Sequence, residues 1–96
     1  MEVSGKVVVV TGGAQGIGEA MCRRFAAEGA AAIVVADLDS RARVIAEELG
    51  SAHAVIADVA READVQRLVA EALKLCGRID LFCSNAGVCT PGGENP

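Results

Sequence analysis

The sequence predicts an α/β protein built on part of a doubly wound parallel sheet. Strand patterns and helix patterns alternate strictly along the chain, and such alternation requires parallel strands joined by right-handed crossovers. The first two strand patterns are continuous apolar runs, which indicates that both faces of the sheet are covered. We expect about four strands in the order 3-2-1-4 and three helices, all within one domain of 96 residues.

The expected strands are short runs rich in β-branched and apolar residues, bounded by turn residues. They cover Lys6–Thr11, Ala31–Ala36, Ala52–Ala57 and Ile79–Ser84. The closing stretch TPGGENP is expected to be a loop, because proline and glycine interrupt regular structure.

Three helices fill the intervals between the strands, and a glycine ends each one. The first covers Gly16–Glu28, the second follows a cap at Asp39 or Ser40, and the third covers Arg61–Cys76. Apolar residues at helical spacing predict the buried face of the first helix, which carries Ile17, Ala20, Met21 and Phe25.

Composition excludes several classes of function. A net charge of -4 disfavours binding to nucleic acid or to an anionic membrane. The longest apolar run, Ala30–Ala36, is far shorter than the roughly 20 residues of a membrane-spanning helix. The first residues lack the basic segment and apolar core of a signal peptide. We therefore expect a cytoplasmic protein with no nucleic-acid or membrane partner.

The four cysteines are interpreted as free residues that pack as small hydrophobes. No two of them form a C-x-x-C pair, and the single histidine, His53, lies far from them in sequence. Cys22 and Cys76 fall in helical patterns and Cys83 in a strand pattern, while Cys89 follows the last strand. We favour this interpretation over a disulfide or a metal site.

A glycine-rich segment joins the first strand to the first helix, with glycines at positions that include Gly12, Gly16 and Gly18. Backbone N–H groups at a helix N-terminus attract anions. In a doubly wound sheet, ligands bind beyond the carboxyl ends of the strands where the strand order reverses. The sequence therefore predicts a pyrophosphate site between the first and fourth strands.

Two other classes of nucleotide-dependent protein also use a glycine loop. A P-loop requires Lys followed by Ser or Thr after its last glycine, whereas Glu19-Ala20 follows Gly18 here, which disfavours nucleotide hydrolysis. Methyltransferases that use S-adenosylmethionine usually carry a carboxylate just before the glycines, where this chain has Thr11. The methyltransferase interpretation is the weaker one and stays open at this point.

Asp37 follows the glycines by about 20 residues, the spacing at which a carboxylate accepts hydrogen bonds from an adenosine ribose. The same charge would repel the 2′-phosphate of NADP and give NAD an advantage of about tenfold to a hundredfold. Gln15 and Leu38 offer that phosphate no cation, and Arg41 and Arg43 are expected to lie in solvent. We therefore expect NAD rather than NADP.

The chain resembles the short-chain dehydrogenases/reductases. Four stretches carry the resemblance, in the family's order and at the expected strand ends: TGGAQGIG (Thr11–Gly18), DLD (Asp37–Asp39), DV (Asp58-Val59) and NAG (Asn85–Gly87). The resemblance covers essentially the whole chain and implies the Rossmann fold, with residues 1–96 as the N-terminal portion of one dinucleotide-binding domain. It also implies NAD as the cofactor, an alcohol or carbonyl compound as the substrate, and a dimer or tetramer as the assembly.

The resemblance assigns roles within the expected site. The backbone of Gly12–Gly18 would hold the pyrophosphate, Asp37 the adenosine ribose, and Asp58-Val59 the adenine, while the NAG stretch would line the cleft beyond the fourth strand. Ser84 stands where family members often have Asn, and Ala60 where a Ser or Thr usually caps the third helix. The expected cofactor-binding residues are Gly12, Gln15, Gly16, Ile17, Gly18, Asp37, Leu38, Asp58, Val59, Asn85, Ala86 and Gly87.

Catalytic residues are not expected in this chain. By resemblance, hydride transfer in the family depends on a tyrosine, a lysine and a serine; the tyrosine and lysine lie well beyond the NAG stretch. This sequence has no tyrosine, and Lys6 and Lys74 are expected away from the cleft. We expect an oxidoreductase segment that is inactive alone because its C-terminal catalytic portion is absent.

The alternative is a non-catalytic dinucleotide-binding module or a truncated product. An unpaired fourth strand would also make the chain self-associate.

Overall fold

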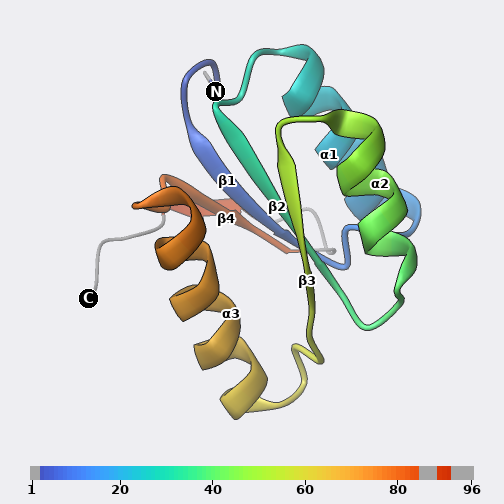
Figure 1. Ribbon diagram of the computed structural model, residues 1–96, viewed down its shortest axis with the longest axis vertical. Coiled ribbons are helices and arrows are strands. Elements are labelled where there is room, and N and C mark those ends of the chain that lie inside the picture. Colours follow the sequence, from blue (N-terminus) through green and yellow to red (C-terminus); the bar gives the residue numbers. More distant parts are fainter. Residues whose placement is uncertain (1–2, 85–88, 92–96) are drawn as a thin grey trace.

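A computed structural model describes residues 3–84 and 89–91, which form a central sheet with helices on both faces (Figure 1). The elements in chain order are β1 (Val7–Thr11), α1 (Gly16–Ala27), β2 (Ala32–Asp37), α2 (Arg41–Leu49), β3 (Ala52–Ile56), α3 (Glu62–Cys76), β4 (Leu81–Cys83) and β5 (Cys89–Pro91). Among the helices of this described part, none is long and apolar enough to cross a membrane.

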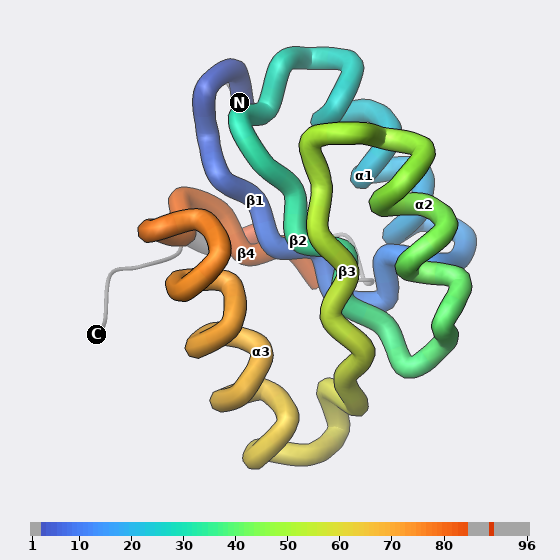
Figure 2. Tube along the Cα trace, in the orientation of Figure 1, coloured from blue at the N-terminus to red at the C-terminus, as the bar shows by residue number. Residues whose placement is uncertain are grey.

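The sheet has the strand order β3-β2-β1-β4-β5. The first four of these strands pair in parallel, and β1 lies at the centre between β2 and β4, as the trace in Figure 2 also shows. The expected order 3-2-1-4 with three helices is therefore confirmed. Because β1 and β2 are interior strands, their residues on both faces are covered by helices, which explains their unbroken apolar sequences.

Two separate cores lie on the two faces of the sheet. Side chains of a strand point alternately to opposite faces. Val8 and Val10 accordingly pack beneath α1 and α2, whereas Val9 packs with Leu68 and Ala72 of α3 on the other face. The arrangement leaves the ends of the strands, rather than either face, as the place where a ligand can reach the sheet.

The amino ends of β1 and β4 are joined by side chains as well as by the backbone. The carboxylate of Asp80 accepts a hydrogen bond from the Val7 N–H at 2.8 Å and a second from Arg78 Nε at 2.9 Å. The N–H of Val7 is the main reason that the pKa of Asp80 lies below its usual value. Arg78 also donates to the Gly5 carbonyl at 2.9 Å. These contacts close the amino end of the sheet, which is opposite the carboxyl ends of β1, β2 and β3.

The buried face of α1 differs from the one expected. Ile17 is 60% exposed and Ala20 is also exposed, while the other two residues expected there are only partly buried. Gly18 and Cys22 are the residues that α1 buries instead. The close approach of α1 to the preceding turn at Gly18 leaves room there only for small residues, whereas Met21 and Phe25 pack against the core as expected.

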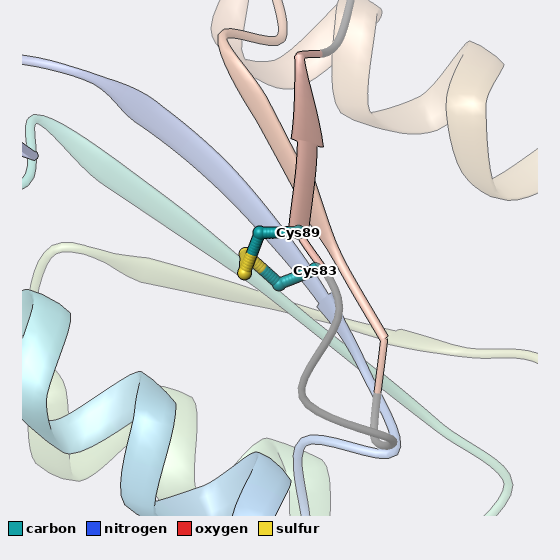
Figure 3. The surroundings of a disulfide bond; sticks show 2 residues. All are labelled: Cys83 and Cys89. Atoms are coloured by element: carbon teal, nitrogen blue, oxygen red, sulfur yellow. A yellow bond between two sulfur atoms is a disulfide. The ribbon is translucent and has the colours of Figure 1, made fainter. Parts of the chain in front are cut away.

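The last described strand, β5, was not expected. It runs antiparallel to β4 with Cys83 opposite Cys89, and a disulfide joins these two residues, whose Cα atoms lie 3.9 Å apart (Figure 3). Three expectations are therefore wrong: β4 is not an open edge, Cys83 and Cys89 are not free, and Thr90-Pro91 is not a loop. Residues 92–96 of the expected loop lie outside the described residues.

The other two cysteines are free, as expected. Cys22 is fully buried in α1, and burial raises the pKa of its thiol to about 12. Cys76, partly buried on α3, also has a raised pKa because of burial. Because burial raises the pKa of both thiols above the usual value, both residues act as packing groups rather than as reactive thiolates.

Candidate functional site

A pocket of about 130 Å³ lies where the carboxyl ends of β1, β2 and β3 meet. Pockets that enclose a whole drug-sized ligand are larger, about 300 Å³ or more, so this one can hold a single ring system rather than a complete dinucleotide. It lies beyond the carboxyl ends of the strands, as ligand sites of doubly wound sheets do, but on the β2–β3 side of β1 rather than between β1 and β4, where the sequence predicted the pyrophosphate. The residues that line it are Gly12, Asp37, Leu38, Ala57, Asp58 and Val59.

The turn between β1 and α1 brings backbone unusually close to backbone. A Cβ atom placed on Gly18 would lie 2.0 Å from the Gly12 carbonyl oxygen, so only glycine fits there. The N–H of Gly13 donates to the Ala36 carbonyl at 3.1 Å, which ties the turn to the end of β2. Gln15, at the start of α1, provides no side-chain cap within the described part of the chain. The positive end of α1 therefore points beyond the strands without a carboxylate cap of its own.

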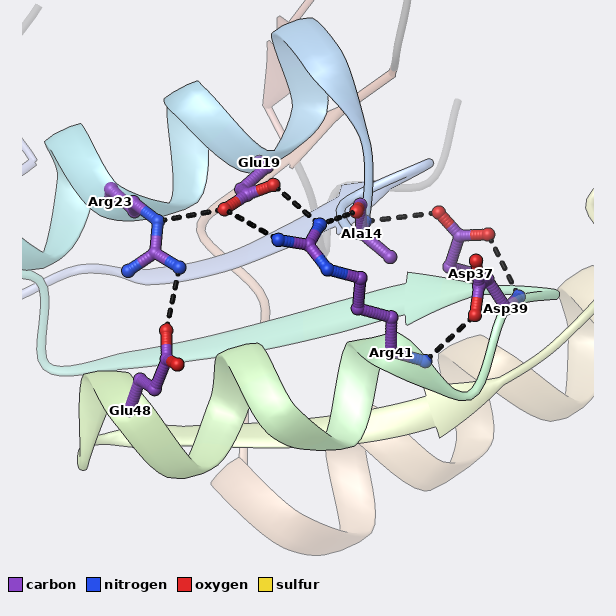
Figure 4. A network of polar contacts seen from close by, with 7 residues as sticks. All are labelled: Ala14, Glu19, Arg23, Asp37, Asp39, Arg41 and Glu48. Atoms are coloured by element: carbon purple, nitrogen blue, oxygen red, sulfur yellow. Dashed lines mark hydrogen bonds and ion pairs between the residues drawn. The ribbon is translucent and has the colours of Figure 1, made fainter.

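Asp37, the last residue of β2, has the most constrained carboxylate of the site. The residue is only 8% exposed. Its Oδ2 accepts a hydrogen bond from the Ala14 N–H at 3.0 Å, and its Oδ1 accepts one from the Asp39 N–H at 3.0 Å (Figure 4). Both oxygens are thus held by backbone, one in the glycine turn and one before α2. Each oxygen keeps a further lone pair for a hydroxyl donor.

The β3 side of the pocket combines apolar surface with an aspartate. Leu38 and Val59, which both line the pocket, are exposed although they are apolar. Asp58 Oδ1 accepts the Ala60 N–H at 3.0 Å, and the Asp58 N–H donates to Asp64 Oδ2 at 2.8 Å. The capping position of α3 is Arg61, which makes no side-chain cap hydrogen bond, and not Ala60 as expected. The two Asp58 bonds instead order the turn that leads into α3. Exposed apolar side chains that flank a pocket are typical of a surface that a ligand covers.

Arg41 does not project into solvent as expected. Although its side chain is 50% exposed, its Nη1 donates to the Ala14 carbonyl at 2.6 Å and to Glu19 Oε1 at 2.7 Å. Glu19 also accepts from Arg23 Nε at 2.9 Å, and the two guanidinium groups, Arg41 foremost, lower the pKa of Glu19. Sequence analysis missed this contact because Glu19 and Arg41 belong to different helices, so no periodic pattern joins them.

The structure gathers some of the expected residues at the pocket and leaves others beside it. Those that line the pocket are Gly12, Asp37, Leu38, Asp58 and Val59. Ala57 lines it too and was not expected, since a small residue at the end of an apolar strand carries no chemical signal. The start of α1 contains the other four: Gln15 as the N-cap, and Gly16, Ile17 and Gly18 in the first helical turn. Outside the described residues lie Asn85, Ala86 and Gly87.

The doubly wound sheet, the glycine turn and the pocket at the strand ends define a ligand-binding α/β domain of the Rossmann type. The chain belongs to the short chain dehydrogenase family, whose model matches residues 6–95. Membership decides against the methyltransferase and P-loop alternatives. Within residues 3–84 and 89–91, no His, Cys, Asp and Glu side chains gather in a group that could hold a metal ion.

Similar proteins include enzymes and solved structures. The chain is 40% identical over 88 residues to an L-fucose dehydrogenase of Bos taurus, and the match covers 92% of this chain and 33% of that protein. A 3-ketoacyl-(acyl-carrier-protein) reductase from Brucella melitensis, complexed with NADH, superposes with a TM-score of 0.79 and 43% identity, over 83% of this chain and 34% of that one.

A short chain dehydrogenase/reductase from Burkholderia phymatum, in complex with NAD, gives a TM-score of 0.80 and 32% identity, over 85% of this chain and 31% of that one. The chain therefore spans about a third of the length of these proteins.

Proposed function

We propose that this chain forms the NAD-binding part of a short-chain dehydrogenase/reductase, an oxidoreductase that acts on an alcohol or carbonyl group of a small molecule. The observation that carries the proposal is the carboxylate of Asp37, which is buried and held by backbone at the edge of the pocket. Such a carboxylate is suited to accept hydrogen bonds from ribose hydroxyls. Two structural neighbours, crystallised with NADH and NAD, support the choice of cofactor.

The residues at the site fit the adenosine diphosphate half of that cofactor. The pocket has room for one ring system, and the apolar side chains of Leu38 and Val59 suit the faces of an adenine. The close backbone approach at Gly18 and the amino end of α1 suit a diphosphate. When bound, NAD would supply a nicotinamide ring that accepts or donates hydride; this chain's part would be to bind and orient the other half.

We further propose that the segment alone transfers no hydride, because the sequence lacks the tyrosine that family chemistry requires. In this proposal the catalytic groups belong to a later part of a longer, cytoplasmic protein, which assembles as a dimer or tetramer as the resemblance implies. A non-catalytic dinucleotide-binding module is the second candidate, and the same missing tyrosine favours it. The two candidates can be separated by expressing a longer chain that includes a Tyr-x-x-x-Lys motif and assaying NAD reduction with alcohol substrates. Activity in the longer chain supports the oxidoreductase, and cofactor binding without activity supports the module.

Titration of the chain with NAD, ADP-ribose and NADP tests the proposal. Calorimetry should give similar dissociation constants for NAD and ADP-ribose, because the described site addresses the half that they share. NADP should bind about tenfold to a hundredfold more weakly, since Asp37 repels its 2′-phosphate. Asp37→Ala should remove most of this preference.

Asp80→Asn is the matched control, because this aspartate lies at the opposite end of the sheet and should leave the preference unchanged. Failure of NAD, ADP-ribose and NADP all to bind would refute the proposal. Equal binding of NAD and NADP by the unaltered chain would refute the assignment of Asp37.

A further inference from the structure

A cation lies directly beside the proposed ribose site. Ala14 donates its N–H to Asp37 Oδ2 at 3.0 Å, and the carbonyl of the same residue accepts from Arg41 Nη1 at 2.6 Å. Figure 4 shows the Arg41 guanidinium and the Asp37 carboxylate on either side of Ala14. A guanidinium so close to a ribose would ordinarily be a binding group for a 2′-phosphate, because Arg pairs strongly with phosphate.

This guanidinium is already engaged by another side chain. Glu19 accepts from Arg41 Nη1 at 2.7 Å and from Nη2 at 3.5 Å. The Glu19 side chain is the more buried partner, at 20% exposure against 50% for Arg41. Arg23 bridges Glu19 to Glu48, so the network of two cations and two anions carries no net charge. The positive charge of Arg41 is therefore neutralised where a phosphate would need it.

We propose that Glu19 is a second determinant of cofactor choice: by holding Arg41 against the glycine turn, it withholds this guanidinium from a 2′-phosphate and so favours NAD over NADP. The inference rests on the proposed function. Asp37 acts by repelling the phosphate, whereas Glu19 acts through Arg41 and is a positioning residue. A phosphate that bound Arg41 through Nη1 would displace Glu19 or the Ala14 carbonyl, and a phosphate that bound through the other guanidinium N–H groups would still be repelled by the charge of Glu19.

The test is the ratio of the dissociation constants for NADP and NAD in the full 96-residue chain, measured by calorimetry. Glu19→Gln keeps the size of the side chain but removes its charge. NADP binding should tighten about tenfold as Arg41 becomes available, while NAD binding stays nearly unchanged. The gain should shrink at high salt, because it is an interaction between partly exposed charges.

Glu48→Gln is the matched control. It breaks the pair with Arg23 and leaves the contact of Glu19 with Arg41 in place, so the ratio should not move. Adding Arg41→Gln to Glu19→Gln should abolish the gain. Arg41→Gln alone, at an exposed position, should leave NADP affinity as it is. A clear loss of NADP affinity in that variant would show that Arg41 already binds the phosphate and would overturn the inference.

The outcomes separate this inference from the proposed function. If Glu19→Gln weakens NAD and NADP binding equally, Glu19 has only a structural role and the inference is wrong, although the proposed function stands. The same conclusion follows if the gain survives without Arg41. If the unaltered chain binds neither cofactor, the proposed function fails and takes the inference with it.

Discussion

A methyl group on Gly18 tests how tightly the glycine turn is packed. The added Cβ would lie 2.0 Å from the oxygen and 2.6 Å from the carbon of the Gly12 carbonyl. Even short C–H···O contacts keep about 3.3 Å between carbon and oxygen, so α1 and the turn must separate by more than about 1 Å. That movement strains the bond from the Ala14 N–H to Asp37. Overpacking costs about 1–3 kcal/mol and a damaged buried hydrogen bond a similar amount, so we expect Gly18→Ala to lose about 3 kcal/mol.

The assay is urea unfolding followed by circular dichroism, with thermal melts in parallel. A loss of about 3 kcal/mol in a domain of this size lowers the melting temperature by about 12–24 °C. Gly16→Ala is the matched control: its Cβ would meet open space, and only its φ of +50° opposes a side chain, at about 1 kcal/mol. If Gly18→Ala proved as stable as Gly16→Ala, the close approach of α1 to the turn would be refuted.

Three further predictions concern stability and reactivity. Reduction of the Cys83–Cys89 bond, whose partners are six residues apart, should lower the free energy of unfolding by about 2 kcal/mol. A reductant should therefore lower the urea midpoint of the unaltered chain and leave the midpoint of Cys89→Ser unchanged. Cys22, with its pKa raised to about 12, should react with a thiol reagent only at the rate at which the chain unfolds. Arg41 lowers the pKa of Glu19, so their pair should stabilise the fold above pH 4.5, the ordinary pKa, and this contribution should vanish as the pH falls further; Glu19→Gln should flatten that part of the pH profile.

The parallel half of the fold could be predicted because each element carries its own periodic signal. The apolar run before the glycines indicates an interior strand, and strict alternation with helices leaves few possible topologies. Asp37 was placed at the site by its spacing from the glycines, Leu38 by its position next to Asp37, and Asp58 and Val59 by the resemblance to the family. These are features that a short window of sequence contains.

The features that were missed depend on partners distant in sequence or on fit. The antiparallel register that sets Cys83 opposite Cys89 has no period to reveal it, since β5 has only three residues. The contact of Arg41 with Ala14 needs the relative placement of α2 and the glycine turn. The burial of Gly18 and Cys22, with Ile17 and Ala20 exposed, follows from the close approach of α1 to the turn at Gly18, which the spacing of apolar residues does not reveal.

The opposite end of the sheet, closed by Asp80 and Arg78, gives the domain two extremities under unlike constraints. A bound cofactor would not contact that end. Asp80 and Arg78 can therefore be replaced by any side chains that still bond the Val7 N–H and the Gly5 carbonyl. The pocket extremity has no such freedom, since there the groups that secure the chain are also those that a nucleotide would touch. Relatives that use a different cofactor should therefore differ from this chain at the pocket. Differences at the amino end of the sheet should affect thermal stability and not cofactor choice.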